Sequence, residues 1–275
     1  MGTDTKIIDF HTHIFPDKIA PGTIDKLERG GGVTAFNTGM EHSLVQEMED
    51  SGVSLCVIQP VVTRPEQFST INMFAAKLNE RYAGKSPALL SFGGIHPKTL
   101  QYRQEIRAIR DMGLKGIKLH PDYQGLYIDD ERYIRLMDYA MELGLIVLIH
   151  AGIDVGYPEL VRACPKRIRR VIDTLHPDKL VLAHYGGYGQ YDQVEEFLVG
   201  ENVYFDTAMA FESGISETQF LRILDRHGAD KILFGTDSPW SSQKANLARL
   251  KNIIGDETVL DRILGGNAME LLGLV

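Results

Sequence analysis

The sequence is poor in cysteine, and it has neither a long apolar run nor a cluster of basic residues. Its two cysteines, Cys56 and Cys164, lie far apart, which excludes a disulfide framework and is typical of a reducing compartment. No apolar segment approaches the roughly 20 residues that a membrane-spanning helix needs. The first residues run directly into a strand pattern, so we expect no signal peptide and a cytoplasmic location.

The charge balance is acidic. The chain has 29 Lys and Arg residues against 37 Asp and Glu, a formal net charge of −8. Since no basic run offsets this charge, we expect no nucleic-acid partner. Apolar residues make up 44% and charged residues 24% of the 275 positions, as in a soluble globular protein. We expect one domain over 1–275 that acts on a small molecule, and self-association into a homo-oligomer stays open.

Short β-rich runs alternate with helical patterns along the chain. The expected strands are 6–13, 54–61, 88–95, 115–120, 145–150, 179–184, 202–207 and 231–236. The expected helices are 42–51, 70–83, 102–112, 130–143, 166–175, 190–199, 216–228 and 243–254. Eight β-then-α units of this length predict an α/β fold, a (β/α)8 TIM barrel. A doubly wound open sheet is the competing parallel architecture.

Two segments lie outside the eight units. Residues 258–275 predict a C-terminal helical extension that packs onto the barrel. Residues 14–41, which include the three consecutive glycines Gly30, Gly31 and Gly32, predict a long and flexible active-site loop.

Polar residues of metal-binding type follow the apolar runs. His11 and His13 end the first predicted strand, and residues two apart on a strand share a face about 6.6 Å apart, so both imidazoles can bind one ion. His150, His184 and Asp237 end three later strands. Polar residues at this rim of a barrel are the usual catalytic set. If all five side chains face the barrel mouth, strand alternation predicts that Phe10, Ile149, Ala183 and Thr236 face the helices.

The order of these motifs along nearly the whole chain resembles the amidohydrolase superfamily, in particular the branch that includes aminocarboxymuconate-semialdehyde decarboxylase. The resemblance rests on the segments 9–13, 116–121, 150–152, 183–187, 235–240 and 266–272. It implies that His11, His13, His150 and Asp237 bind a divalent metal, and that Asp237 also handles a proton. It implies that His184 is a catalytic residue beside a single ion, or a ligand of a second one.

Simpler structural roles are also open for these residues. The histidines of the set can be rim or core residues satisfied by loop and backbone groups, and Asp237 can be the N-cap of a helix that begins after Ser238 and Pro239. Lys118 is either a carboxylated bridge between two ions, as in two-metal relatives, or a buried lysine that is paired or contacts the substrate.

Several other rim residues have expected roles. We expect His120, Arg64 and Trp240 to contact substrate, with Tyr123 and Tyr185 adding to an aromatic wall. Arg64 and Lys98 either bind a carboxylate at the rim or are solvated loop cations. His96 is expected at the rim, and Asp206 either braces loops or takes part in the chemistry.

A nitrogen-rich ligand set favours one zinc ion, with manganese, iron and cobalt as alternatives. Such an ion lowers the pKa of bound water to about 7, so we expect a metal-dependent hydrolase that cleaves a C–N or C–O bond in a small polar metabolite. The same site can serve a metal-dependent decarboxylase of an unsaturated or aromatic carboxylic acid, which is the first alternative. The second alternative is a metal-binding barrel without catalytic activity.

Overall fold

The computed structural model describes residues 6–274, and the N-terminal segment on which the expected absence of a signal peptide rests lies largely outside them. All paired strands are parallel. They are β1 (Ile8–Thr12), β2 (Leu55–Ile58), β3 (Ala88–Ser91), β4 (Gly93–Gly94), β5 (Gly116–Leu119), β6 (Ile146–Ile149), β7 (Leu180–Leu182), β8 (Tyr204–Asp206) and β9 (Ile232–Leu233). The expected strand 88–95 is interrupted at Phe92, so β3 and β4 together form one barrel strand.

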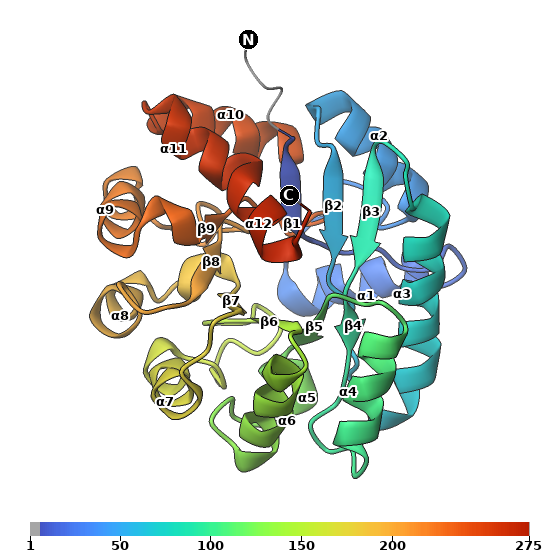
Figure 1. Ribbon diagram of the computed structural model, residues 1–275. Helices are drawn as coiled ribbons and strands as arrows, with labels where there is room; N and C mark the ends of the chain where they lie inside the picture. Colours follow the sequence, from blue (N-terminus) through green and yellow to red (C-terminus); the bar gives the residue numbers. More distant parts are fainter. Residues whose placement is uncertain (1–5, 275) are drawn as a thin grey trace.

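The two ends of the sheet meet and close the ring. Phe10 N donates to Phe234 O at 2.8 Å, and Asp237 N donates to His11 O at 2.7 Å. On the outer side of β1, the Asp9 carboxylate accepts hydrogen bonds from the Thr236 hydroxyl (2.6 Å) and the Gln243 amide (2.9 Å). The first and last strands are therefore neighbours, and the predicted (β/α)8 barrel is confirmed (Figure 1).

Helices surround the barrel on its outer side (Figure 1). The eight expected helices are present as α2 (Glu41–Ser51), α3 (Phe68–Tyr82), α4 (Tyr102–Asp111), α6 (Glu131–Glu142), α7 (Pro165–Leu175), α8 (Tyr191–Phe197), α9 (Glu217–His227) and α10 (Gln243–Ile253), and a one-turn helix α5 (Pro121–Gln124) follows β5. Three of them begin at side-chain caps, since Asp130, Ser216 and Ser242 accept hydrogen bonds from backbone N–H groups of the first turn. Among residues 6–274 no helix combines the length and apolarity of a membrane span.

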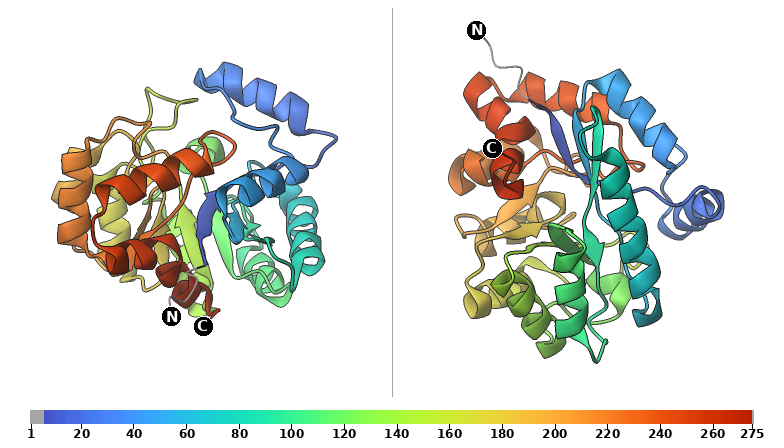
Figure 2. Two further views of the ribbon diagram at one scale, coloured as in Figure 1. Left: turned by 90° about the horizontal axis from the view of Figure 1, so that it is seen from above. Right: turned by 45° about the vertical axis from the view of Figure 1, so that its right-hand side comes forward.

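The prediction of a wholly flexible first loop was wrong. Residues Ala20–Gly31 form helix α1, which projects from the body of the barrel (Figure 2). Pro21 lies in its first turn, and Gly32 ends it in the left-handed region at φ 63°. The run of three glycines obscured these two signals. Only Ala20 and Ile24 of α1 are buried, so little apolar surface holds the helix to the barrel.

The barrel interior is an apolar cluster that the C-terminal extension closes. Inward side chains come from strands all around the ring and include Ile8, Phe10, Val57, Phe92, Leu148, Val181, Ala183 and Leu233. The predicted extension consists of α11 (Glu257–Asp261), a π-helical turn (Arg262–Gly266) and α12 (Asn267–Leu272). Leu271 and Leu272 join the interior cluster, and Lys115, just before β5, donates to Leu272 O at 2.8 Å. Helix α12 therefore covers the end where strands begin, and the opposite end remains for a site (Figure 1).

The expected alternation of side chains holds for only part of the site. Ile149 packs toward the helices and Thr236 bonds to Asp9, as predicted, but Phe10 and Ala183 lie in the barrel interior. In β1 the cause is a bulge, because the register with β2 runs from Asp9–Cys56 to Thr12–Ile58 and so contains an extra residue. Phe10 and His11 consequently both reach the interior side.

We expect Leu272→Ala to lower the free energy of unfolding by about 2–5 kcal/mol, because Leu272 fills the closed end of the barrel and is 2% exposed. Urea unfolding followed by circular dichroism measures this change. The matched control is Leu274→Ala two residues later, where the side chain is 41% exposed and the expected change stays within about 0.5 kcal/mol. Equal effects of the two substitutions would contradict the placement of α12.

Candidate metal centre

Three predicted ligands converge at the open end of the barrel. His13 Nε2 lies 3.0 Å and His11 Nε2 3.4 Å from Asp237 Oδ1, and the two imidazole nitrogens are 3.2 Å apart. Ligand atoms about 2.1 Å from a common tetrahedral or octahedral ion lie roughly 3.0–3.4 Å from one another. The three atoms therefore have the spacing of a metal site, and the chemistry of two imidazoles with one carboxylate fits a divalent ion.

The backbone of Asp237 directs its carboxylate to this point. Its N–H pairs with His11 O, and its φ of 67° turns the chain sharply after β9. A non-glycine residue in this left-handed region costs about 1 kcal/mol and is held by its surroundings. Asp237 is not a helix cap, because α10 begins six residues later with Ser242 as its cap. The alternative of a purely structural Asp237 at a helix start was therefore wrong.

The protonation states of these groups suit metal binding. Burial raises the pKa of Asp237, but the hydrogen bond from His13 and the nearby positive charges outweigh this effect, so the pKa lies below its ordinary value. Burial lowers the pKa of His11 well below that of a free imidazole, and Lys118 lowers it further. An ionised carboxylate and a neutral imidazole are the forms that bind metal.

Lys118, on β5, approaches one of these three atoms. Its Nζ lies 3.1 Å from His11 Nε2 and the side chain is almost fully buried. Burial lowers the pKa of Lys118 to about 8, although Asp206, Asp237 and Asp154 oppose the shift. This position agrees with both predicted roles for Lys118, the carboxylated bridge and the cation that contacts substrate.

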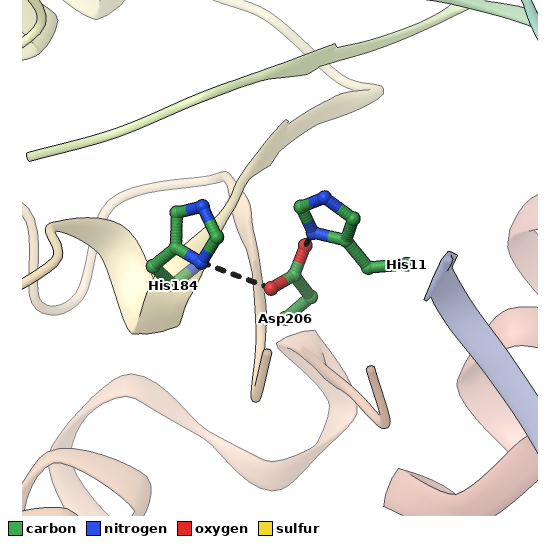
Figure 3. A group of neighbouring side chains, drawn as sticks. All are labelled: His11, His184 and Asp206. Atoms are coloured by element: carbon green, nitrogen blue, oxygen red, sulfur yellow. Dashed lines mark hydrogen bonds and ion pairs between the residues drawn. The ribbon is translucent and has the colours of Figure 1, made fainter. Parts of the chain in front are cut away.

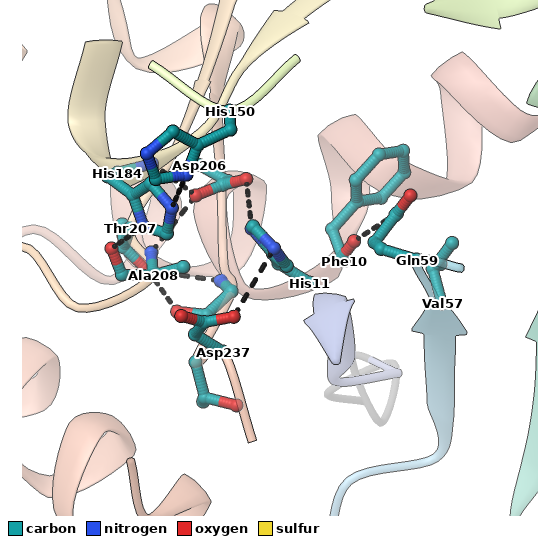
Figure 4. Close-up of polar contacts among 12 residues, drawn as sticks. Phe10, His11, Val57, Gln59, His150, His184, Asp206, Thr207, Ala208 and Asp237 are labelled. Atoms are coloured by element: carbon teal, nitrogen blue, oxygen red, sulfur yellow. Dashed lines mark hydrogen bonds and ion pairs between the residues drawn. The ribbon is translucent and has the colours of Figure 1, made fainter. Parts of the chain in front are cut away.

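His150 and His184 form a second pair beside the three ligands. His184 Nε2 lies 3.0 Å from His150 Nδ1, and His184 Nδ1 lies 3.1 Å from Ala208 O (Figure 4). His184 follows the end of β7, and its φ of 58° turns its ring toward the site instead of leaving it among the helices. Burial lowers the pKa of His184 to about 4, so the ring is neutral at pH 7. His150 Nε2 is buried and has no hydrogen-bond partner among the described residues.

Asp206 connects the two groups. Its Oδ2 lies 2.9 Å from His11 Nδ1, and its Oδ1 accepts a hydrogen bond of 2.9 Å from the backbone N–H of His184 (Figure 3). The side chain is fully buried at the end of β8. Burial raises the pKa of Asp206 to about 7, against the opposing charge of Lys118. The sequence left two roles open for Asp206, bracing loops or taking part in the chemistry. Its contacts with His11 and His184 place it at the site.

His120 lies next to His150, but this pair does not offer a good metal site. The two rings stack in nearly parallel planes, 12° apart with centroids at 4.2 Å. An imidazole binds an ion in the plane of its ring, so parallel stacked rings do not direct their nitrogens to one point. Asp154, which no strand-end pattern marks, lies 3.4 Å from His120 through Oδ2 and Nε2. His120 therefore lines the mouth, which agrees with the predicted substrate contact.

Tyrosines surround the mouth, although not all of those that we expected. Tyr123 packs edge-on against His120 with centroids 4.5 Å apart, and Tyr157 packs against Tyr123 at 5.5 Å. Tyr188 lies edge-on to His184 at 5.7 Å. Tyr185 instead stacks on Phe220 in the core, so its placement in the aromatic wall was wrong. His184 and Tyr185 both have left-handed backbone, and the two adjacent side chains point to opposite sides, His184 to the mouth and Tyr185 to the core.

Gly152 allows Tyr188 to reach this position. The segments after β6 and β7 pair through Tyr188 N to Ala151 O (2.9 Å) and Ile153 N to Tyr188 O (3.1 Å). A Cβ on Gly152 would lie 2.1 Å from Tyr188 N, and the φ of Gly152 is 88°. No other residue type fits this contact.

The remaining predicted contacts lie further out. Arg64 is exposed before the 3-10 turn Pro65–Gln67, Lys98 is exposed, and Trp240 is half-buried. His96 is buried and accepts a hydrogen bond from Lys98 N at 3.1 Å. Substrate contact by Arg64 and Trp240 stays a prediction.

Comparison with known families agrees with this geometry. The amidohydrolase family model matches residues 8–274. The chain belongs to this family. No curated protein matches its sequence.

The fold recurs in solved structures. An uncharacterised TIM-barrel protein from Bordetella bronchiseptica is 19% identical, with a TM-score of 0.77 and 98% coverage of both chains. A 5-carboxyvanillate decarboxylase from Novosphingobium aromaticivorans, in complex with manganese, is 13% identical, with a TM-score of 0.72 and 98% and 96% coverage. A probable 2-pyrone-4,6-dicarboxylic acid hydrolase from Acinetobacter baumannii is 16% identical, with a TM-score of 0.67 and 98% and 99% coverage. Decarboxylases recur among the further matches.

We expect the double variant His11→Ala, His13→Ala to lose bound metal, because it removes two of three converging ligands. Elemental analysis after dialysis against zinc or manganese should give about one ion per wild-type chain and almost none for the variant. Thermal unfolding checks that the barrel stays folded. The control is His42→Ala on the exposed surface of α2, which should keep the full metal content. Full metal retention by the double variant would refute the site.

Proposed function

We propose that the protein is a metal-dependent decarboxylase of an aromatic or unsaturated carboxylic acid. The observation that carries this proposal is the combination of a ligand cluster and Lys118 with three tyrosines around one mouth. A planar carboxylated ring suits that combination, because its carboxylate can face the cationic groups while its ring contacts the tyrosines. The decarboxylases among proteins of the same fold support this assignment over our first expectation of a C–N or C–O hydrolase.

His11, His13 and Asp237 would hold the ion, with His150 as the further nitrogen ligand. The nitrogen-rich set favours zinc, and manganese is the alternative that one protein of the same fold binds. When bound, the ion supplies positive charge that stabilises negative charge on the substrate. Lys118 lies close enough to contribute to the same effect.

The reaction needs a proton at carbon. When the bond between the ring carbon and the carboxyl carbon breaks, carbon dioxide leaves and the electron pair stays on the ring carbon. Asp237 lies at the ligand cluster, where it can take a proton from an ionising group of the substrate and donate it to that carbon. His184, neutral and next to His150, is the second group that can position or relay a proton. Tyr123 and Tyr188, both half-buried at the mouth, would limit the access of water to the reacting carbon.

Hydrolysis is the second candidate, and one observation favours it. The lowered pKa of Asp237 keeps its carboxylate ionised, which suits a base that takes a proton from water. A panel of hydroxylated aromatic and unsaturated acids, assayed for carbon dioxide, separates the two reactions from a panel of lactones and amides assayed for acid or ammonia. Steady carbon dioxide release that depends on added metal supports the decarboxylase. Turnover of lactones or amides alone would replace it with a hydrolase.

Asp237→Asn should abolish turnover in either reaction, because an amide of equal size cannot accept the transferred proton and binds metal more weakly. Activity should be measured at saturating metal, together with metal content, so that a lost proton acceptor is distinguished from a lost ion. Near-native turnover of Asp237→Asn would exclude the proposed proton transfer.

His184→Ala should lower activity by on the order of 10²–10⁴-fold while about one ion per chain remains bound. The reason is that His184 lies beside the predicted ligands but directs Nε2 to His150. Steady-state rates and elemental analysis on one preparation test this split, with His42→Ala as the control. Loss of a stoichiometric ion from His184→Ala would instead make His184 a ligand.

A further inference from the structure

The hydrogen bonds around Asp206 determine which nitrogen of each neighbouring histidine carries a proton. Ala208 O can only accept, so His184 Nδ1, at 3.1 Å, carries the hydrogen. A buried imidazole that carries its hydrogen on Nδ1 has an unprotonated Nε2, which is an acceptor. His150 Nδ1, 3.0 Å away, must therefore donate to it. His150 Nε2 is consequently left with a free lone pair, and it is the buried nitrogen without a partner among the described residues.

His11 is likewise fixed in one tautomer. His11 Nδ1 lies 2.9 Å from Asp206 Oδ2, and an ionised carboxylate only accepts, so His11 Nδ1 carries the hydrogen and His11 Nε2 keeps the lone pair. That nitrogen faces His13, Asp237 and the Lys118 ammonium. Both His11 and His150 thus present an unprotonated Nε2, which is the form that can bind an ion.

The Asp206 carboxylate takes part in both sets of hydrogen bonds. Asp206 Oδ1 accepts hydrogen bonds from the backbone N–H groups of His184 (2.9 Å) and Ala208 (3.1 Å). Asp206 Oδ2 contacts His11 Nδ1 (Figure 4). These two backbone bonds hold the left-handed turn at His184 and the segment that carries Ala208 O. All of its described bonds are accepted, and the side chain is fully buried.

We propose that Asp206 is the positioning residue of the metal centre, which holds His11, His184 and, through His184, His150 in the Nδ1–H tautomer. This inference rests on the proposed metal site. It adds a residue that does not bind the ion but decides whether two predicted ligands can bind it.

The variant Asp206→Asn tests the proposal with little change of shape. The two backbone N–H groups should keep the amide oxygen at the Oδ1 position, so the amide NH2 faces His11 Nδ1 and donates to it. The proton of His11 then moves to Nε2, which blocks metal binding. We expect the affinity for zinc or manganese to fall about 10–100-fold. The matched control is Asp122→Asn, a buried carboxylate that accepts from Arg162 N and bonds to no predicted ligand.

Nitrogen-15 NMR of the histidine rings reads the tautomers directly in metal-free protein. The wild type should show His11, His150 and His184 as Nδ1–H, and Asp206→Asn should show His11 as Nε2–H. An Nε2–H tautomer of any of the three in the wild type would overturn the proposal, and this measurement does not require the variant to fold. An unchanged His11 tautomer with metal affinity within about threefold of wild type would also overturn it.

The NMR and the affinity measurements test the role of Asp206 independently of the proposed reaction. If the wild type binds no divalent ion, the metal centre fails, yet the ring tautomers still support or overturn the role of Asp206. If metal binds and no acid is decarboxylated, the proposed reaction fails while the affinity of Asp206→Asn still tests the positioning role.

Discussion

The parallel pairing of the first and last barrel strands is the interaction on which the candidate site depends. It joins Asp237 N to His11 O and thereby brings a carboxylate from the end of the chain to two histidines near its start. On the outer side of β1, the Asp9 carboxylate stabilises the same pairing by accepting hydrogen bonds from Thr236 and Gln243. The pKa of Asp9 is raised to about 7 by burial, and the hydrogen bonds that it accepts favour its ionised form. Without this pairing, Asp237 would not converge with His11 and His13.

The site itself is built where the strands stop being regular. A bulge in β1 brings Phe10 and His11 to the same side, and left-handed residues at His184 and Asp237 turn their side chains into the mouth. Each irregularity costs free energy, and the surrounding hydrogen bonds to Asp206 and His11 O offset it. The charges of Lys118 and Asp206, which are buried, and of Asp237, which is nearly so, compensate one another.

These irregularities also explain what the sequence could and could not predict. The alternation of apolar runs and helical patterns predicted the barrel, and the polar residue after each run predicted His11, His13 and Asp237 as neighbours. Alternation failed at Phe10 and Ala183, since a bulge or a left-handed turn depends on contacts between distant segments. The link between Asp206 and His11 spans 195 residues, and no local pattern indicates it. Asp154 lies in the loop after β6 and not at the end of a strand, so the pattern of polar strand-end residues does not mark it.

The central claim is that the mouth of this barrel binds one divalent ion through His11, His13 and Asp237. A crystal structure of zinc-loaded protein, with anomalous diffraction recorded on both sides of the zinc absorption edge, tests it most directly. The account predicts one anomalous peak about 2.0–2.2 Å from His11 Nε2, His13 Nε2 and Asp237 Oδ1, with His150 Nε2 as the next ligand. A peak between His120 and Asp154, or none at the mouth at saturating zinc, would contradict it.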